Sequence, residues 1–194
     1  MIKRTHTCGE LNLDQLDSKV SINGWISKIR DLGGLIFIDL RDRYGITQIF
    51  FNEKTNQDIF NIVKKLGLED VIGIAGNVIK RPQDAINKSM VTGHIDIEVE
   101  KLIVYNESDS PPFDINNRDS ASEEHRLRYR YLELRTRELQ NNLLVRSDAL
   151  LVTRQFFASK QFSEIETPIL MKSTPEGARD FLVPSRIHHG KFYA

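Results

Sequence analysis

The sequence predicts a small β-barrel in its first part and a mainly helical segment after it. Five strand-like stretches lie between residues 20 and 104, and one helical stretch separates the third from the fourth. A polar connector follows, with paired prolines at 111–112 and paired asparagines at 116–117, which is typical of a linker. A five-stranded barrel with one helix between strands three and four is the pattern of the OB-fold.

The first three strands are predicted over residues 20–30, 35–41 and 46–51. Gly24 interrupts the apolar alternation of the first strand, which indicates a bulge or a close approach of the backbone. In the second strand every other residue is aliphatic, so one face is expected to be buried. Glycine- and aspartate-rich turns at 31–34 and 42–45 separate the strands.

The helix after the third strand is predicted to begin at Thr55 as N-cap and to stop at Gly67. Its apolar stripe consists of Ile59, Val63 and Leu66. The fourth strand is predicted over 71–81, where a proline ends it. The fifth, over 95–104, begins with strict alternation, so isoleucine and valine are expected to face inward and Asp96 to face solvent.

Composition is that of an ordinary globular protein, with 40% hydrophobic and 28% charged residues. The formal net charge is +0, so no global basic field attracts nucleic acid, although one local face can still bind a few unstacked bases. The one cysteine, Cys8, excludes an internal disulfide, and no Cys/His spacing predicts a metal site. Without a membrane span or signal peptide, a cytoplasmic protein with no membrane partner is expected.

Phe37 is a candidate for a binding role because it is a large aromatic on the polar face of its strand. In OB-folds the second and third strands form the nucleic-acid platform, and a base stacked on an aromatic ring gains about 1–3 kcal/mol. Gln48 and Arg30 could converge on the same patch, where amide and guanidinium groups read base edges. On the pattern alone, Phe37 packed under a loop with Gln48 and Arg30 solvated is an equal alternative.

Two further stretches contain candidate binding residues. The arginine-rich run at 126–137 could contact phosphates, although a solvated helix face paired with neighbouring glutamates is favoured for a lone charge run. The loop at 173–180 carries Glu176, whose carboxylate suits a ligand ammonium group, or it is a plain surface loop. A long helix is predicted over 138–159 and an extended stretch over 162–170. No phosphate-binding loop, dinucleotide fingerprint or nucleophile elbow is present.

Five stretches resemble signatures of the bacterial aspartyl-tRNA synthetases, which are class II enzymes. They are, in order, residues 4–11, 35–43, 127–135, 165–170, and 173–186 together with 190–194. The resemblance implies an OB-fold anticodon-binding domain over 1–106, a linker or hinge over 107–137, and the incomplete start of a class II α+β catalytic domain over 138–194. The family's motifs 2 and 3 have no counterpart here, so no catalytic residue is assigned and the chain alone is expected to be inactive.

The resemblance also implies roles for single residues. Phe37 would stack on the central anticodon base, while Gln48 and Arg30 would contact anticodon bases. Glu176 would approach the amino group of aspartate, and Pro168 lies in motif 1, which builds the class II homodimer. Gln161 stands where the family commonly has glycine, which leaves the backbone conformation there open.

Family members activate L-aspartate with ATP and Mg²⁺ and transfer it to tRNA(Asp), and none of these cofactors is expected to bind this part of the enzyme well. Some members also charge tRNA(Asn); Leu32 favours an aspartate-only enzyme, and Asp84 is a second candidate for that discrimination. Two alternatives remain at this point: an OB-fold tRNA- or RNA-binding module without catalysis, and an interaction protein that dimerises through motif 1. The abrupt stop at Ala194 favours an enzyme fragment over both.

Overall fold

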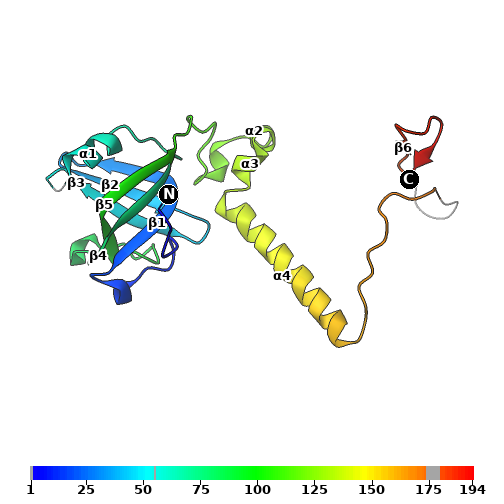
Figure 1. Ribbon diagram of the computed structural model, residues 1–194, viewed down its shortest axis with the longest axis horizontal. Helices are drawn as coiled ribbons and strands as arrows, with labels where there is room; N and C mark the ends of the chain where they lie inside the picture. Colours follow the sequence, from blue (N-terminus) through cyan, green and yellow to red (C-terminus); the bar gives the residue numbers. More distant parts are fainter. Residues whose placement is uncertain (1, 55, 174–179) are drawn as a thin grey trace. The chain divides into compact units, whose positions relative to one another are not determined.

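The computed structural model describes residues 2–54, 56–173 and 180–194, and it divides into two compact units, Met1–Leu139 and Gln140–Ala194. The first unit contains a closed five-stranded barrel with strand order β1-β2-β3-β5-β4 (Figure 1). Its elements are β1 (Lys19–Asp31), β2 (Leu35–Arg41), β3 (Ile46–Asn52), α1 (Gln57–Val63), β4 (Val71–Lys80) and β5 (Ile95–Asn106). Neighbouring strands are antiparallel except β3 and β5, which run parallel and close the barrel. The predicted order of five strands and one helix is confirmed.

The inward-facing residues of the five strands fill the barrel with branched aliphatic side chains. Ile22, Ile38, Ile49, Ile74 and Ile97 are all fully buried, one from each of the five strands. Removing such a side chain from water contributes about 1.5–3 kcal/mol, so this set supplies much of the driving force for closure. The barrel therefore holds its outer face on a rigid support.

The first strand changes phase at a bulge between Ile26 and Lys28, two residues later than the glycine that the alternation singled out. At Gly24 the strands instead approach closely, because a Cβ there would lie 2.4 Å from the carbonyl oxygen of Arg41. Beyond the bulge, Arg30 pairs with Phe37. The bulge thus turns Arg30 to the outer face of the barrel.

Helix α1 covers one end of the barrel with Phe60 and Val63, both buried. Its N-cap is Asn56, whose side chain accepts a hydrogen bond from the backbone N–H of Ile59. Thr55, the predicted cap, lies outside the described residues. Short 3₁₀ turns occur at η1 (Leu13–Gln15), η2 (Gln83–Ala85) and η3 (Arg118–Ser120).

The connector (residues 107–136) belongs to the same compact unit as the barrel. It contains α2 (Glu123–Arg128) and α3 (Arg130–Glu133), which enclose a small apolar cluster of their own. Phe113, Ile115 and Leu132 form this cluster, with Tyr129 packed against it. The stretch that the sequence presents as a polar linker is therefore folded.

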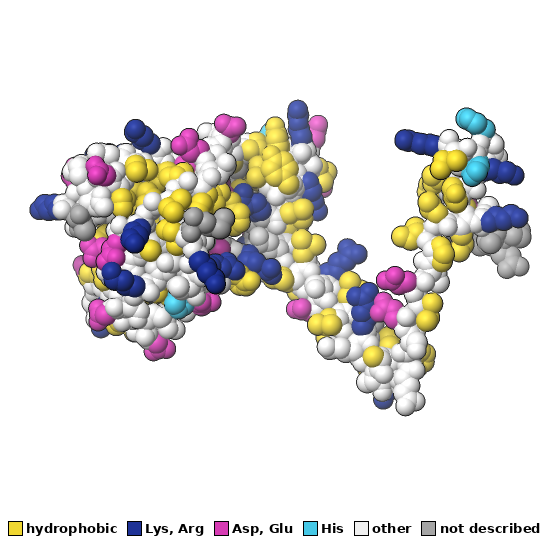
Figure 2. Space-filling model, in the orientation of Figure 1, with side chains coloured by type: hydrophobic (Ala, Val, Ile, Leu, Met, Phe, Trp, Pro, Cys, Tyr) yellow, Lys and Arg dark blue, Asp and Glu magenta, His cyan; other side chains and the backbone are white. Residues whose placement is uncertain are grey.

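The predicted long helix is confirmed as α4 (Arg137–Ser159), which begins at the end of the first unit and continues into the second. Every described residue of α4 from Asn141 onward is exposed, and apolar side chains are visible along it (Figure 2). Residues 162–170 carry no regular secondary structure, and a two-stranded ladder of β6 (Val183–Pro184) and β7 (Phe192–Tyr193) follows. None of the helices in the described part of the chain has the length and apolar character needed to cross a bilayer.

Gln161, two residues after the end of α4, has a left-handed backbone conformation with φ of 64°. The amide of Gln161 donates to the carbonyl of Ala158 and that of Phe162 donates to the carbonyl of Phe157, which together form a Schellman motif. Gln161 therefore occupies the position where such motifs usually place glycine.

Candidate nucleic-acid interface

The outer face of β1, β2 and β3 brings three of the predicted binding residues together. In the strand register Arg30 lies opposite Phe37, and Asp39 lies opposite Gln48. One guanidinium nitrogen of Arg30, Nη2, donates to Oε1 of Gln48 at 2.6 Å and to Oδ1 of Asp39 at 3.0 Å. The alternative in which Arg30 and Gln48 are separately solvated does not describe this arrangement.

Two aromatic rings form the apolar part of this face. The rings of Phe37 and Phe50 lie side by side across β2 and β3, with centroids 5.8 Å apart and planes tilted by 31°. The guanidinium carbon of Arg30 lies 6.0 Å from the Phe37 ring centroid. Both rings are only partly buried, so the face offers an apolar surface beside a cation.

The hydrogen bond from Arg30 determines how Gln48 presents its amide. Because Oε1 of Gln48 accepts from a guanidinium, which can only donate, the amide NH₂ group must point the other way. Gln48 is only 7% exposed, whereas the Arg30 side chain that covers it is 43% exposed. Arg30 is thus the exposed member of this contact and Gln48 the buried one.

The ion pair of Arg81 and Asp96 adjoins this face, and the pattern of the sequence did not predict it. Asp96 was predicted to face solvent, but it is 5% exposed because Arg81, which follows β4, covers it. Nε of Arg81 donates to Oδ1 of Asp96 at 2.9 Å; Nη2 lies 2.7 Å from the same oxygen without the geometry of a hydrogen bond. The ion pair could have been predicted from the pairing register of β4 and β5, which brings the end of β4 next to the start of β5.

Burial raises the pKa of the Asp96 carboxyl, and this outweighs the hydrogen bond and charge of Arg81, which act in the opposite direction. The charge of Arg30 lowers this pKa and that of Asp39 raises it, both to a smaller extent. Asp96 directly precedes Ile97, which pairs with Ile49 of β3 next to Gln48, so the polar groups of β5 adjoin those of β3.

The remaining predicted site residues lie elsewhere or are not described. Leu32 is 71% exposed in the β1–β2 turn, and Asp84 is exposed in η2. Pro168 lies in the irregular stretch of the second unit and is exposed. Glu176 lies outside the described residues. The outer face of β1–β3 thus brings Arg30, Phe37 and Gln48 together.

Part of the arginine-rich run in the connector forms ion pairs with a buried glutamate. Glu133 is 1% exposed and accepts hydrogen bonds from Arg118, Arg126 and Arg130. Burial raises the pKa of the Glu133 carboxyl, but these three guanidinium groups outweigh burial and hold the pKa below its ordinary value.

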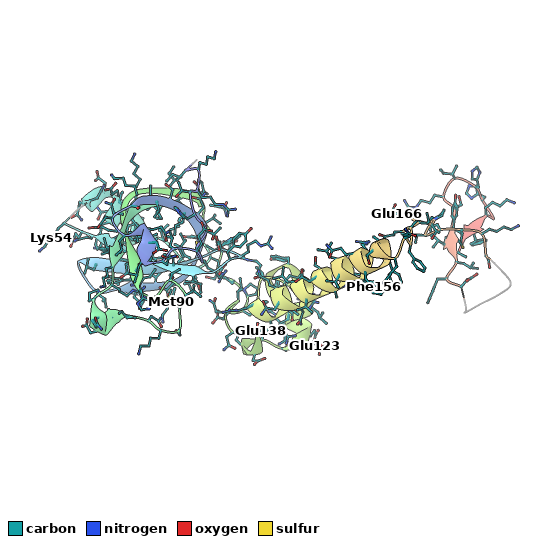
Figure 3. The ribbon with its side chains drawn as sticks, turned by 90° about the horizontal axis from the view of Figure 1, so that it is seen from below. Lys54, Met90, Glu123, Glu138, Phe156 and Glu166 are labelled. Carbon is teal, nitrogen blue, oxygen red and sulfur yellow. The ribbon has the colours of Figure 1, made fainter. Side chains whose placement is uncertain are left out.

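Within the described residues, no ion pair forms to Glu123 or Glu138, which lie at the starts of α2 and α4 (Figure 3). The expectation of a solvated face paired with glutamates is therefore correct for only part of the run, because Glu133, the partner of Arg126 and Arg130, is buried.

Comparisons with known proteins agree with both parts of the chain. Residues 20–104 match the family model for the OB-fold nucleic acid binding domain, and residues 122–194 match the model for class II tRNA synthetases (D, K and N). The aspartate–tRNA(Asp/Asn) ligase of Aquifex aeolicus is 47% identical over 99% of this chain, and the aspartate–tRNA ligase of Mycoplasma mycoides is 50% identical over all of it. The matches cover 32% and 33% of those proteins, so the chain spans about a third of their length.

Solved structures give the same fold. An asparaginyl-tRNA synthetase from Pyrococcus horikoshii, complexed with asparaginyl-adenylate, superimposes with a TM-score of 0.83 at 26% identity, covering all of this chain and 42% of that one. An aspartyl tRNA synthetase from Entamoeba histolytica gives a TM-score of 0.77 at 21% identity over 86% of this chain and 39% of that one, which supports the fold alone. Because similarity runs through the barrel and the segment after it, a ligase is favoured over a free-standing OB-fold module. Over its whole length the chain is therefore similar to the first third of aspartate–tRNA ligases, which are class II synthetases.

Proposed function

We propose that this chain is the anticodon-binding part of an aspartate–tRNA ligase and that it binds tRNA(Asp) through the outer face of β1–β3. The observation that carries the proposal is the contact between Arg30 and Gln48 beside the partly exposed ring of Phe37. Together these groups offer a stacking surface, an oriented amide and a cation. Sequence-specific recognition of RNA targets unstacked bases with this combination.

Each residue has a distinct part in the proposed recognition. The ring of Phe37, extended by that of Phe50, stacks on the central anticodon base and contributes about 1–3 kcal/mol. The NH₂ group of Gln48 donates to a carbonyl oxygen on the edge of that base. Arg30 moves aside from Gln48 and uses its remaining N–H groups on a neighbouring base or phosphate.

Leu32 and Asp84 are proposed to contribute to the choice between tRNA(Asp) alone and both tRNA(Asp) and tRNA(Asn). Both are exposed, and they lie in loops that follow β1 and β4. Relatives of both kinds match this chain at similar identity. Leu32 favours the aspartate-only choice.

For the whole protein we propose the activity of the family. It activates L-aspartate with ATP and Mg²⁺, transfers it to tRNA(Asp) and works in the cytoplasm. Glu176 approaches the amino group of aspartate, and the stretch around Pro168 forms a homodimer interface with the exposed apolar residues of α4. The domains are proposed as 1–106 for anticodon binding, 107–137 for the hinge and 138–194 for the start of the catalytic domain.

The described residues do not supply a magnesium site by themselves. Mg²⁺ takes six oxygen ligands, usually with one or two carboxylates and the phosphates of a substrate. Among residues 2–54, 56–173 and 180–194 no three acidic, histidine or cysteine side chains gather as ligands would. No chemical step is therefore assigned to this part of the protein.

Binding of the tRNA(Asp) anticodon stem–loop, measured by fluorescence anisotropy at fixed salt, tests the proposal. Phe37→Leu keeps an apolar side chain but removes the stacking face, so affinity should fall by about 1–3 kcal/mol. Tyr44→Leu is the matched control, because Tyr44 is 55% exposed on the β2–β3 turn and also has an arginine over its ring, Arg43 at 5.1 Å. Unchanged affinity for Phe37→Leu, or an equal loss for Tyr44→Leu, would exclude this face as the anticodon platform.

A further inference from the structure

The loop between α1 and β4 carries two adjacent buried carboxylates, Glu69 and Asp70, and each contacts the connector. Glu69 is 6% exposed and Asp70 is 3% exposed. Asp70 accepts hydrogen bonds from the backbone N–H groups of Gly67 and Ser108, at 2.7 Å each. Ser108 is the second residue of the connector, so Asp70 fixes the point where the chain leaves the barrel.

Glu69 joins the barrel to the far end of the connector. Nη2 of Arg41, on β2, donates to both carboxylate oxygens of Glu69 at 2.9 Å. Nη2 of Arg135 donates to Oε2 of the same carboxylate, and the guanidinium carbon of Arg135 lies 4.6 Å from the centroid of the Trp25 ring. One carboxylate therefore holds two guanidinium groups, one from the barrel and one from the connector.

A third contact lies between these two. Nη1 of Arg41 donates to Oδ1 of Asn116 at 3.0 Å, and Oγ of Ser27 donates to the same oxygen at 3.2 Å. The connector is thus held at its start, its middle and its end. Arg41 takes part in the last two of these contacts, so they share one guanidinium group.

The strained backbone at Glu69 indicates that glutamate is present at this position because of the contacts that its side chain makes. Glu69 has φ of 68°, in the left-handed region, which costs about 1–2 kcal/mol for a residue with a Cβ. Glycine or asparagine would fit the same conformation with less strain. A position that violates the local backbone preference needs a compensating gain, and the two guanidinium contacts provide one.

We propose that Glu69 is a positioning residue that clamps the connector onto the barrel, so that the barrel strands and the connector move as one body. The clamp makes the connector a rigid extension of the RNA-binding face instead of a flexible tether. Removing the carboxylate leaves Arg135 without its ionic partner, and the only tryptophan of the chain, Trp25, loses the cation over its ring.

Two variants of the whole chain test the clamp. Glu69→Asn removes the charge and suits the positive φ, so the backbone itself does not destabilise the barrel. Arg135→Met leaves the pair of Glu69 and Arg41 intact and releases only the connector. In both variants amide hydrogen exchange should rise by about 10-fold or more across the connector, because a buried ion pair has lost one partner. In Arg135→Met the exchange of β1–β5 should stay unchanged, because Arg41 of β2 keeps its contacts with Glu69. Quenching of Trp25 fluorescence by acrylamide should rise in parallel.

Glu100→Gln is the matched control, since it removes an exposed salt bridge with Lys19 on the same barrel. It should change neither connector exchange nor Trp25 quenching. Connector exchange that stays at the wild-type rate in Arg135→Met would overturn the proposal. A rise of equal size in the barrel strands would do the same, because Glu69 would then be a general stability residue. Neither measurement uses RNA, so failure of the clamp and failure of anticodon binding are separate results.

Discussion

Nη2 of Arg30 donates a hydrogen bond of 2.6 Å to Oε1 of Gln48, across the outer face of β1–β3. Since a guanidinium group cannot accept, this bond assigns the oxygen and nitrogen of the Gln48 amide. The face therefore presents a donor from Gln48, which matches a base with a carbonyl on its exposed edge. A variant that exchanges this donor for an acceptor therefore tests the proposed base contact more directly than a variant that removes the whole side chain.

Gln48→Glu replaces the donor by a second acceptor of nearly the same shape. The carboxylate still accepts from Arg30, which offsets part of the cost of a second carboxylate beside Asp39, and circular dichroism checks that the barrel stays folded. Affinity for the tRNA(Asp) anticodon stem–loop should fall by about 1–3 kcal/mol or more, because the base edge then faces an unpaired acceptor. Fluorescence anisotropy at fixed salt measures the loss.

Gln57→Glu makes the same change of charge at an exposed position of α1 and serves as the control. The two variants have the same net charge, so nonspecific repulsion of RNA weakens both. Equal losses would mean that Gln48 contributes no hydrogen bond to the base.

The second prediction concerns the buried pair of Arg81 and Asp96, whose side chains are 3% and 7% exposed. Arg81→Met leaves the Asp96 carboxylate buried without a partner, and the free energy of unfolding at pH 7 should fall by about 3–5 kcal/mol. Urea unfolding monitored by circular dichroism measures this. Arg43→Met, at an exposed position of the β2–β3 turn, should have little effect.

The deficit of Arg81→Met should shrink as the pH is lowered towards about 4. Burial already raises the pKa of Asp96 in the folded protein, and loss of Arg81 raises it further. A carboxyl whose folded pKa is raised contributes most to stability below its unfolded pKa, and that contribution is lost as pH rises through the folded pKa. A deficit that is constant from pH 7 to pH 4 would show that packing, not charge, is what Arg81 supplies.

The fold was predictable because local patterns and global packing agree in the barrel. Alternation in β2, with Ile36, Ile38 and Leu40 buried, identifies both the strand and its inner face. The same alternation places Phe37 on the outer face, which is why a binding candidate could be identified before any contact was known.

Contacts between distant parts of the sequence were not predictable in this way. Asp96 follows the outward alternation of β5, yet Arg81 from outside the strand buries it. Glu69 is 28 residues from Arg41 and 66 residues from Arg135, and no periodicity relates them. The connector has the composition of a linker, but buried Glu133 and three arginines hold it folded.

The last prediction concerns the C-terminus of α4. Gln161 holds the left-handed position of a Schellman motif with φ of 64°, and the rings of Phe157 and Phe162 lie 5.5 Å apart across it. This is the apolar contact that commonly accompanies the motif. Gln161→Gly removes the clash of Cβ in the left-handed region, so the helix end should gain about 1 kcal/mol. Hydrogen exchange of the Phe162 amide, which donates to Phe157, should slow by about fivefold.

Gln161→Ala tests whether any gain comes from helix propensity and not from the relief of backbone strain at residue 161. Alanine is the better helix former but keeps Cβ, so it should give no comparable slowing. If Gln161→Ala protects the Phe162 amide as well as Gln161→Gly does, the positive φ is not what limits the helix end. If only glycine protects it, the strain at Gln161 is the cost of ending α4 with the two phenylalanine rings in contact.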